Sequence, residues 1–213
     1  MKVLINHFKK ALYAFVFIAF SSSFAGSYDD FFKAIERDDA TTVAKLIARG
    51  FDVNTVGPTG LHGLLLALNT SSPKVLAVLL DAPGIQAEQR NPNDESALML
   101  AALAGKREVC ERLIALDADV NKTGWTPLHY AATAGRADIV KLLLDHYAYI
   151  DAESPNQTTP LMMAAMYGNA ATVSALLVAG ADAHLRNQKG LSALDFAKVS
   201  GREEIYKLIA QKL

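Results

Sequence analysis

Leucine, alanine and glycine recur along the chain in one pattern of apolar and small positions. The leucines of this pattern are Leu61, Leu98, Leu128, Leu161 and Leu194, so that the spacing between successive leucines is nearly regular. Three of them are followed by an Ala-Ala pair and then a glycine, namely Ala101-Ala102 with Gly105, Ala131-Ala132 with Gly135 and Ala164-Ala165 with Gly168. Self-similarity at such a period indicates a repeat architecture.

Each copy contains two short segments with helical spacing. The first begins with Thr126-Pro127 in one copy and Thr159-Pro160 in the next. Threonine is a good N-cap, and proline is tolerated in the first helical turn. The second segment, residues 139–144 in one copy, has the apolar spacing of a helix of about two turns. Small alanines let the paired helices approach closely, and the glycine permits a tight turn between them. Each copy therefore predicts a helix, a turn, a second helix and an extended loop.

Two motifs relate these copies to a known family. Residues 126–131 read Thr-Pro-Leu-His-x-Ala, and residues 118–121 read Ala-Asp-Val-Asn. Both resemble the ankyrin repeat. The resemblance implies an all-α ankyrin-repeat solenoid of about six helix-turn-helix units with short hairpin fingers. We expect units at 28–57, 58–93, 94–122, 123–155, 156–188 and 189–213. The first unit would contain helices at 29–37 and 41–49, and the last would cap the stack with a polar outer face.

Residues 1–25 have the three parts of a secretory signal peptide. A basic region ends at Lys9-Lys10, an apolar region covers 11–20, and a small, mostly polar stretch covers 21–25. The alternative is an uncleaved membrane anchor, but the apolar region is short of the roughly 20 residues needed to span a bilayer. We expect cleavage after Ala25 and a single domain over 26–213, which would lie in the periplasm or be secreted without a membrane anchor.

Charge and cysteine content narrow the function. The chain has 21 Lys and Arg and 22 Asp and Glu, and removing residues 1–25 with their three lysines leaves a net charge of −4. An acidic domain without a basic run does not favour nucleic-acid binding. Cys110 is the only cysteine, so an intrachain disulfide is excluded. We interpret Cys110 as a buried small residue, with a reactive thiol as the alternative.

The fingers of the expected solenoid differ in length, measured from the Val position of the Asp-Val-Asn motif to the aligned leucine. Two fingers share the standard spacing, namely Ile150 to Leu161 and Ala183 to Leu194. The first and third fingers, Val53 to Leu61 and Val120 to Leu128, are three residues shorter. The second finger, Ile85 to Leu98, is predicted to be two residues longer and to end in an irregular loop at residues 91–94.

Two positions after the second helices carry a side chain where Gly50 and Gly180 stand in other copies. These are Asp117 and Tyr147, and each would cost about 1 kcal/mol if it kept the left-handed conformation that glycine allows. Tyr147 and Tyr149 would then form an exposed aromatic patch. The alternative is that their rings cover neighbouring helix ends.

The sequence favours a binding protein over an enzyme. It contains no nucleophile elbow, phosphate-binding glycine loop or zinc-type Cys/His cluster, and we expect no cofactor and no metal. His62 and His129 stand at the motif histidine, for which the resemblance implies a structural role. The acidic pairs Asp38-Asp39 and Glu203-Glu204 lie at predicted helix starts, where negative charge is favourable.

The resemblance also implies where a partner protein would bind. In the family the groove is lined by finger tips and by the exposed side of each first helix, which gives Trp125, Thr133, Glu153, Asn156, Thr158, Met166, Tyr167, Arg186, Gln188 and Leu191. For Trp125 the alternative is packing on its own hairpin. We expect a monomer that binds another protein. In size and organisation the chain also resembles some small exported ankyrin proteins of proteobacteria that support a periplasmic catalase or other oxidative-stress defence, and the resemblance implies such a role as a hypothesis. An effector or toxin-immunity protein, or an enzyme with an unfamiliar site, are the other hypotheses.

Overall fold

Helix pairs joined by protruding loops make up the described chain, which is residues 26–213 of a computed structural model. The predicted signal peptide, residues 1–25, lies outside the described residues. The chain divides after Ile85 into two units, here unit 1 and unit 2. The helix, turn, helix and loop expected for each copy is confirmed in both units, and the described residues form an all-α repeat fold.

Unit 1 contains two helix pairs. Residues 26–36 are helical and pair with α2, and the second pair consists of α3 and α4. The bounds are Ala40–Ala48 for α2, Gly63–Asn69 for α3 and Pro73–Leu80 for α4. The core is apolar, because Phe31, Ile35, Leu64, Leu65 and Leu79 are all fully buried. The N-terminal pair agrees with the helices predicted at 29–37 and 41–49.

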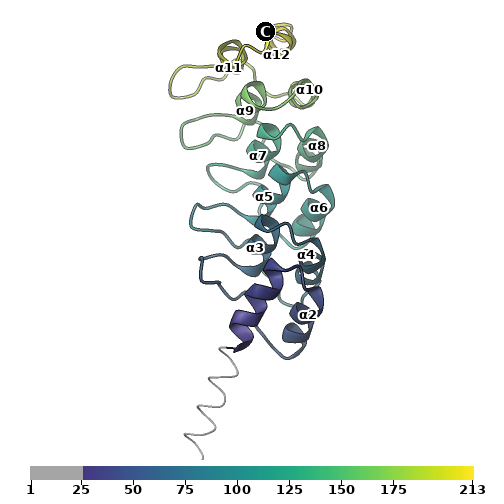
Figure 1. The fold of residues 1–213 in the computed structure, drawn as a ribbon. Coiled ribbons are helices and arrows are strands. Elements are labelled where there is room, and N and C mark those ends of the chain that lie inside the picture. The colour runs from purple at the N-terminus through teal and green to yellow at the C-terminus, as the bar shows by residue number, and fades with distance from the viewer. Residues whose placement is uncertain (1–25) are drawn as a thin grey trace, which may run out of the picture. The chain divides into compact units, whose positions relative to one another are not determined.

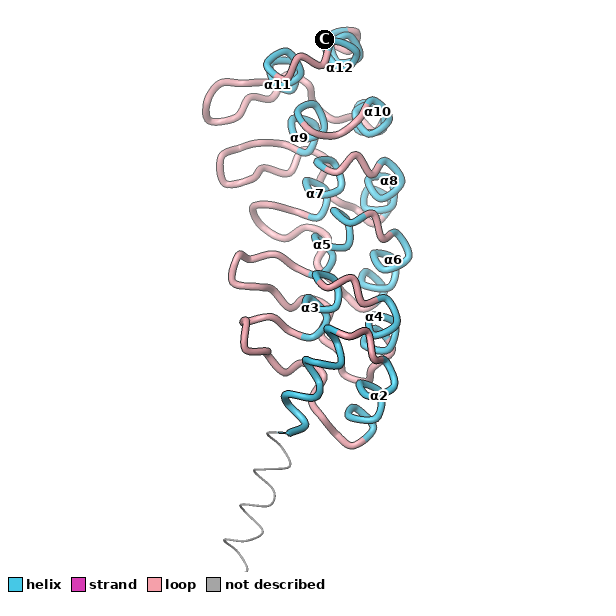
Figure 2. The backbone as a smooth tube through the Cα atoms, viewed as in Figure 1, coloured by secondary structure: helices cyan, strands magenta, loops and turns pink. Residues whose placement is uncertain are grey.

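Unit 2 contains four helix pairs. Their bounds are Ala97–Ala104 and Arg107–Ala115 (α5, α6), Pro127–Thr133 and Ala137–Asp145 (α7, α8), Pro160–Met166 and Ala170–Val178 (α9, α10), and Ala193–Val199 and Glu203–Ala210 (α11, α12). The first helices α5, α7, α9 and α11 stack in one column and the second helices in another (Figure 1). The fingers leave the column of first helices on the side away from the second helices (Figure 2).

The helix boundaries follow from the capping residues. Thr126 and Thr159 are N-caps whose side chains accept the backbone N–H of His129 and Met162, and a proline follows each. Ser96 and Ser192 cap α5 and α11 in the same way. A cap of this kind satisfies an N–H group that the helix itself leaves unpaired. These interactions keep each first helix at seven or eight residues.

The glycines between paired helices do not all serve the same purpose. Gly105 and Gly135 have φ of 73° and 68°, the left-handed conformation that the predicted tight turn needs. Gly168 does not adopt a left-handed φ. A Cβ atom there would lie 2.5 Å from Ala132 O in the preceding repeat. Gly168 is therefore required by the close approach of two repeats, and the prediction that it serves the turn is wrong.

The prediction of a lengthened second finger is also wrong. Ala87, and not Ile85, is the buried residue at the Val position. Asn121, which follows Val120, accepts a backbone N–H group of the next repeat through Oδ1, and Glu88 Oε2 accepts Asp119 N (2.8 Å) in the same way. Glu88 is therefore the equivalent of Asn121, and Ala87 is the equivalent of Val120. Counted from Ala87 to Leu98, the finger has the standard length. The extra residues precede Ala87 in the chain.

The tip of this finger is ordered. Asn91 N donates to Glu95 O (3.0 Å) and Asp94 N donates to Asn91 O (2.9 Å), while Arg90 and Ser96 form an antiparallel bridge. These bonds close a compact hairpin in place of the predicted irregular loop. Asn91 Oδ1 also accepts the N–H groups of Asn93 and Glu95 and so stabilises the turn.

Four further residues were singled out in the sequence: Asp117, Tyr147, Tyr149 and Cys110. Asp117 and Tyr147 are left-handed, with φ of 61° and 63°. Tyr147 is 85% exposed and Tyr149 is 69% exposed, so their rings do not cover helix ends. Cys110 is fully buried, and burial raises the pKa of its thiol to about 12, which disfavours the reactive thiolate. None of the helices in residues 26–213 has the length and apolarity that crossing a bilayer requires.

Candidate interaction surface

Two neighbouring fingers of unit 2 are bonded to each other at their tips. They are residues 146–159, here the α8–α9 finger, and residues 179–192, the α10–α11 finger. The backbone N–H of Gln188 donates to Asn156 O (3.1 Å), and the side-chain Nε2 of Gln188 donates to Pro155 O (3.0 Å). These bonds hold the two tips in one register.

Each of these fingers also has an internal cap. Ser154 Oγ accepts the backbone N–H of Thr158 (3.0 Å). Asn187 Oδ1 accepts the N–H groups of Lys189 (3.0 Å) and Leu191 (3.1 Å). Both capping residues are buried, so the turns are stabilised from inside. The polar side chains at the tips remain exposed to solvent.

The ten predicted site residues differ in exposure. Five are exposed: Glu153, Asn156, Tyr167, Arg186 and Gln188. Four are half-buried: Trp125, Thr133, Met166 and Leu191. Thr158 is only 3% exposed; its backbone N–H donates to Ser154 of the same finger, and its carbonyl is bonded to His129 of the preceding repeat. The prediction that Thr158 contacts a partner is therefore wrong, since its side chain is not accessible.

The structure brings only some of these residues together. Asn156 and Gln188 are in direct contact. Arg186 Nη1 donates to Gly190 O (2.6 Å) and to Asp195 Oδ2 (3.2 Å), which orients its side chain within its own repeat. Met166 ends α9, and Tyr167, which is 57% exposed, follows it directly.

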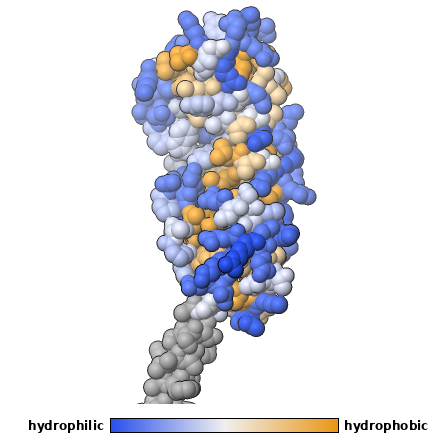
Figure 3. Space-filling model, in the orientation of Figure 1, coloured by the Kyte–Doolittle hydropathy of each residue, from blue (hydrophilic) through white to orange (hydrophobic). Residues whose placement is uncertain are grey.

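A mainly apolar stripe runs along the first helices of unit 2. Its residues lie three or four apart on each helix and therefore share one side. They are Leu100 and Leu103 on α5, Tyr130 and Thr133 on α7, Met163, Met166 and Tyr167 on and after α9, and Phe196 and Val199 on α11. All are half-buried or exposed. Because α5, α7, α9 and α11 pack in sequence, these residues form one surface, here the inner stripe. Figure 3 shows hydrophobic side chains along the helices, whereas the finger side is largely hydrophilic.

Trp125 packs on its own repeat. Its ring meets the imidazole of His129 edge to face, with centroids 5.2 Å apart and an angle of 74° between the planes. The tryptophan is half-buried. The ring thus contacts helix α7 of its own repeat and stays partly exposed, so hairpin packing and a partner contact both remain predictions for Trp125.

The structural role predicted for the motif histidines is confirmed. His129 is fully buried; its Nδ1 lies 2.9 Å from Thr126 Oγ1 and 3.2 Å from Thr126 N, and its Nε2 lies 2.8 Å from Thr158 O in the next repeat. Burial lowers the pKa of His129 to about 4, which keeps the ring neutral at pH 7. His62 makes a single bond, from Nδ1 to Asn54 O (2.9 Å).

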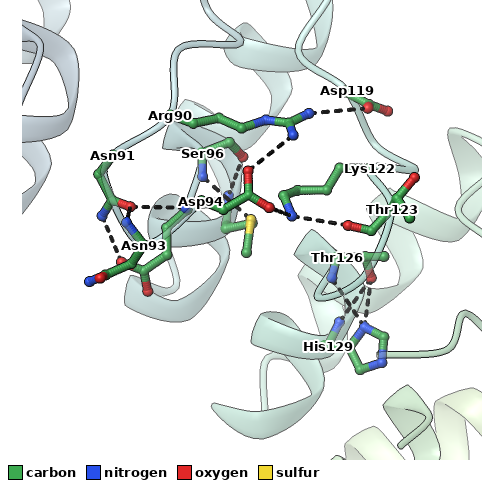
Figure 4. A network of polar contacts seen from close by, with 12 residues as sticks. Arg90, Asn91, Asn93, Asp94, Ser96, Asp119, Lys122, Thr123, Thr126 and His129 are labelled. Atoms are coloured by element: carbon green, nitrogen blue, oxygen red, sulfur yellow. Dashed lines mark hydrogen bonds and ion pairs between the residues drawn. The ribbon is translucent and has the colours of Figure 1, made fainter. Parts of the chain in front are cut away.

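A charge network that the sequence reasoning missed supports the α6–α7 finger, residues 116–126 (Figure 4). The side chain of Lys122 is only 3% exposed, and its amine contacts Asp94 and donates to Thr123 O. Arg90 pairs with Asp94 (3.1 Å) and, at 3.8 Å, with Asp119. The hydrogen bond from Lys122 lowers the pKa of Asp94, so this carboxylate stays ionised.

A signal for this network was present in the sequence. The α6–α7 finger is three residues shorter than the standard one, and Lys122 directly follows the Asp-Val-Asn motif. The stem of a lysine can fill apolar space while its amine reaches a carboxylate. The partner, Asp94, lies in the preceding finger, and only the folded repeat brings the two together.

Within residues 26–213, no three His, Cys, Asp or Glu side chains are grouped so that they could hold a metal ion. The paired acidic residues have structural roles: Asp39 caps α2 through the N–H of Thr42, and Asp38 Oδ1 accepts Val75 N (2.9 Å). What the surface of unit 2 offers is a pair of polar fingers beside an apolar stripe.

Known proteins share this repeat. The family model for ankyrin repeats (3 copies) matches residues 64–154 and 149–212. The chain is 28% identical over 178 residues to the human transient receptor potential cation channel subfamily A member 1, covering 78% of this chain and 16% of that protein. It is 29% identical over 147 residues to the tyrosine-protein kinase Shark of Drosophila melanogaster, covering 67% and 16%.

A further relative is the neurogenic locus notch homolog protein 1 of Xenopus tropicalis, with 32% identity over 164 residues. The alignment covers 68% of this chain but only 6% of that protein. The chain thus spans a small part of the curated relatives it matches, and the similarity concerns the repeats. With the family model matching residues 64–212 and the repeat geometry described above, the chain belongs to the ankyrin-repeat family.

Proposed function

We propose that this protein is a non-enzymatic interaction module of the bacterial periplasm, which binds a partner protein on the concave face of unit 2. The face comprises the inner stripe and the tips of the α8–α9 and α10–α11 fingers. Ankyrin repeats generally mediate protein–protein interaction. Fold alone does not identify a partner, so the proposal depends on the features of this surface.

One observation carries the proposal. The two fingers are bonded to each other through Gln188, beside a stripe on which Tyr167 is 57% and Val199 is 76% exposed. Exposed apolar side chains that are adjacent and rimmed by polar groups are typical of protein-binding sites. A rigid rim lowers the entropic cost of binding, because the fingers are already ordered.

The proposed location depends on residues 1–25, whose basic, apolar and small-residue regions have the order of a secretory signal. It is tested by sequencing the N-terminus of the protein recovered from a periplasmic extract. A mature chain that begins at Gly26 supports export. A chain that keeps Met1 and stays with the cytoplasmic fraction contradicts it.

The first partner we propose to test is a periplasmic catalase or another component of oxidative-stress defence. A strain lacking this protein should lose resistance to hydrogen peroxide and periplasmic catalase activity. Unchanged resistance and activity would exclude this partner. A toxin or host enzyme captured in the same experiments would instead support the effector or toxin-immunity alternative.

The binding face is tested by affinity capture from the native periplasm. The test variant carries Met166→Ala and Tyr167→Ala, which truncate the inner stripe without touching a buried residue. The control variant carries Val178→Ala, which truncates an exposed apolar side chain on the second helix α10, outside this face. We expect the test variant to lose the partner and the control variant to retain it. Equal capture by both would contradict the proposed face.

A further inference from the structure

Residues of α8 and α10 line an open depression on the outer face of unit 2. These two helices belong to the column of second helices, away from the fingers (Figure 1). The depression has a volume of about 410 Å³. The lining is mostly small and apolar and comprises Ala137, Lys141, Leu144, Asp145, Ala171, Ser174, Ala175, Val178 and Ala179. Val178 is 78% exposed although it is a large apolar residue. This depression is independent of the surface proposed above to bind a partner.

Two opposite charges in this depression lack a partner. Lys141 and Asp145 lie one turn apart on α8, yet neither forms a side-chain hydrogen bond or ion pair with any residue of 26–213. Pairs at the same spacing on other second helices do bond, at 3.0 Å for Arg107 with Glu111 and 3.3 Å for Lys207 with Glu203. The two charges of α8 are therefore available to an external partner.

A small and a larger residue of α10, Ser174 and Val178, lie beside these two charges of α8. Since α8 and α10 are equivalent helices of successive repeats, Ser174 lies level with Lys141, and Val178 lies level with Asp145. A two-fold axis that lies in the face and crosses both helices midway would place Lys141 against Asp145 of a second copy. The same axis would place the exposed Val178 against the small Ser174. Such self-complementarity is what an isologous contact requires.

We propose that this protein forms a two-fold symmetric homodimer through the α8–α10 face, which departs from the monomer expected from the sequence. Two symmetric ion pairs set the register, and Val178 of each copy fills the depression of the other. The fingers lie on the opposite side of the helices and stay free, so each dimer presents two partner-binding faces. The contact is small, and we expect a dissociation constant on the order of 10 µM.

This dimer is tested by reversing the charges of Lys141 and Asp145, first singly and then together. The protein, expressed from the full-length gene and purified, is studied by sedimentation equilibrium. Lys141→Asp or Asp145→Lys alone places like charges against each other twice, and each should weaken self-association about tenfold or more. The double variant Lys141→Asp with Asp145→Lys should restore it. Mixing the two single variants should give a heterodimer, because every pair is then attractive.

The control is Lys207→Asp, a charge reversal at another exposed lysine, on α12, which should leave self-association unchanged. Circular dichroism of each variant confirms that the fold is kept. A wild type that stays monomeric up to about 500 µM, fifty times the expected constant, overturns the proposal. Dimers that resist both single reversals, or single variants that fail to associate when mixed, also overturn it.

Discussion

The α6–α7 finger and the two fingers that follow it are stabilised by different kinds of interaction. The α6–α7 finger is short, and charged side chains hold it, with the buried Lys122 contacting Asp94 of the preceding repeat. The α8–α9 and α10–α11 fingers have standard length and are closed by neutral caps, Ser154 and Asn187. Their tips then bond to each other through Gln188.

This difference decides which finger can offer polar groups to a partner. In the α6–α7 finger, Lys122 is committed to the scaffold, and Trp125 is committed to His129. In the later fingers buried residues do the capping, so Glu153, Asn156 and Lys189 remain exposed. The stunted finger therefore serves stability, whereas the regular fingers combine stability with an accessible surface.

The largest expected effect comes from the histidine at the base of the α6–α7 finger. His129→Ala removes a buried ring together with its bonds to Thr126 and Thr158, and we expect a loss of about 4 kcal/mol in the free energy of unfolding. His62→Ala, which removes a single part-buried bond, should cost about 1 kcal/mol. Urea denaturation measures both. Equal losses would mean that His129 does not link its repeat to the α8–α9 finger.

Acid should lower the free energy of unfolding through the same residue, His129. The pKa of His129 is lowered from 6.5 to about 4, so the unfolded chain binds a proton before the folded chain does. The stabilisation that the neutral His129 ring contributes is fully present above pH 6.5 and is lost as the pH falls to about 4. The loss should reach about 2–3 kcal/mol. Urea denaturation at pH 7, 5 and 4 measures it, and His129→Asn should reduce this pH dependence. An unchanged slope in that variant would contradict the assignment.

Removing the buried Lys122 should lower stability more than removing an exposed lysine of the α10–α11 finger. Lys122→Ala deletes a packed side chain and its contacts to Asp94 and Thr123, and we expect a loss of about 2 kcal/mol. Lys189→Ala, at the exposed tip of the α10–α11 finger, should change stability by less than about 0.5 kcal/mol. Thermal unfolding compares the two. A larger loss at Lys189 would reverse the contrast drawn between the fingers.

The smallest expected effect concerns the residues that begin these fingers. Tyr147 holds a left-handed φ of 63° where the equivalent residue of the next repeat is Gly180, with φ of 98°. Tyr147→Gly should therefore raise the free energy of unfolding by about 0.5–1 kcal/mol, whereas Gly180→Ala should lower it by about 1 kcal/mol. Urea midpoints of the two variants test the sign. Destabilisation by Tyr147→Gly would show that the exposed ring adds stability.

Much of the fold could be predicted because the signals are local. The leucine spacing, the Thr-Pro caps and the motif histidines each lie within one copy. The features that were predicted wrongly or missed depend on contacts between copies. Ile85 and Ala87 are both apolar, and only the bond from Asp119 to Glu88 in the preceding repeat shows which one occupies the Val position. Gly168 and Lys122 likewise depend on atoms of a neighbouring repeat.

The candidate site could be predicted only in part for the same reason. Position in the motif correctly gave exposed side chains at Asn156 and Gln188, but it could not show that these two residues bond to each other. It also placed Thr158 on the surface, although that residue closes the hairpin from inside. Burial in a finger depends on the turn geometry, which the motif does not specify.

Backbone amide hydrogen exchange with and without the captured partner tests the central claim most directly. Bound partner should slow exchange in the α8–α9 finger, the α10–α11 finger and the C-terminal end of α9. The α6–α7 finger and helices α8 and α10 should exchange as they do in the free protein. Protection confined to residues 116–126 or to the outer helices, with residues 146–159 and 179–192 unchanged, would contradict the account.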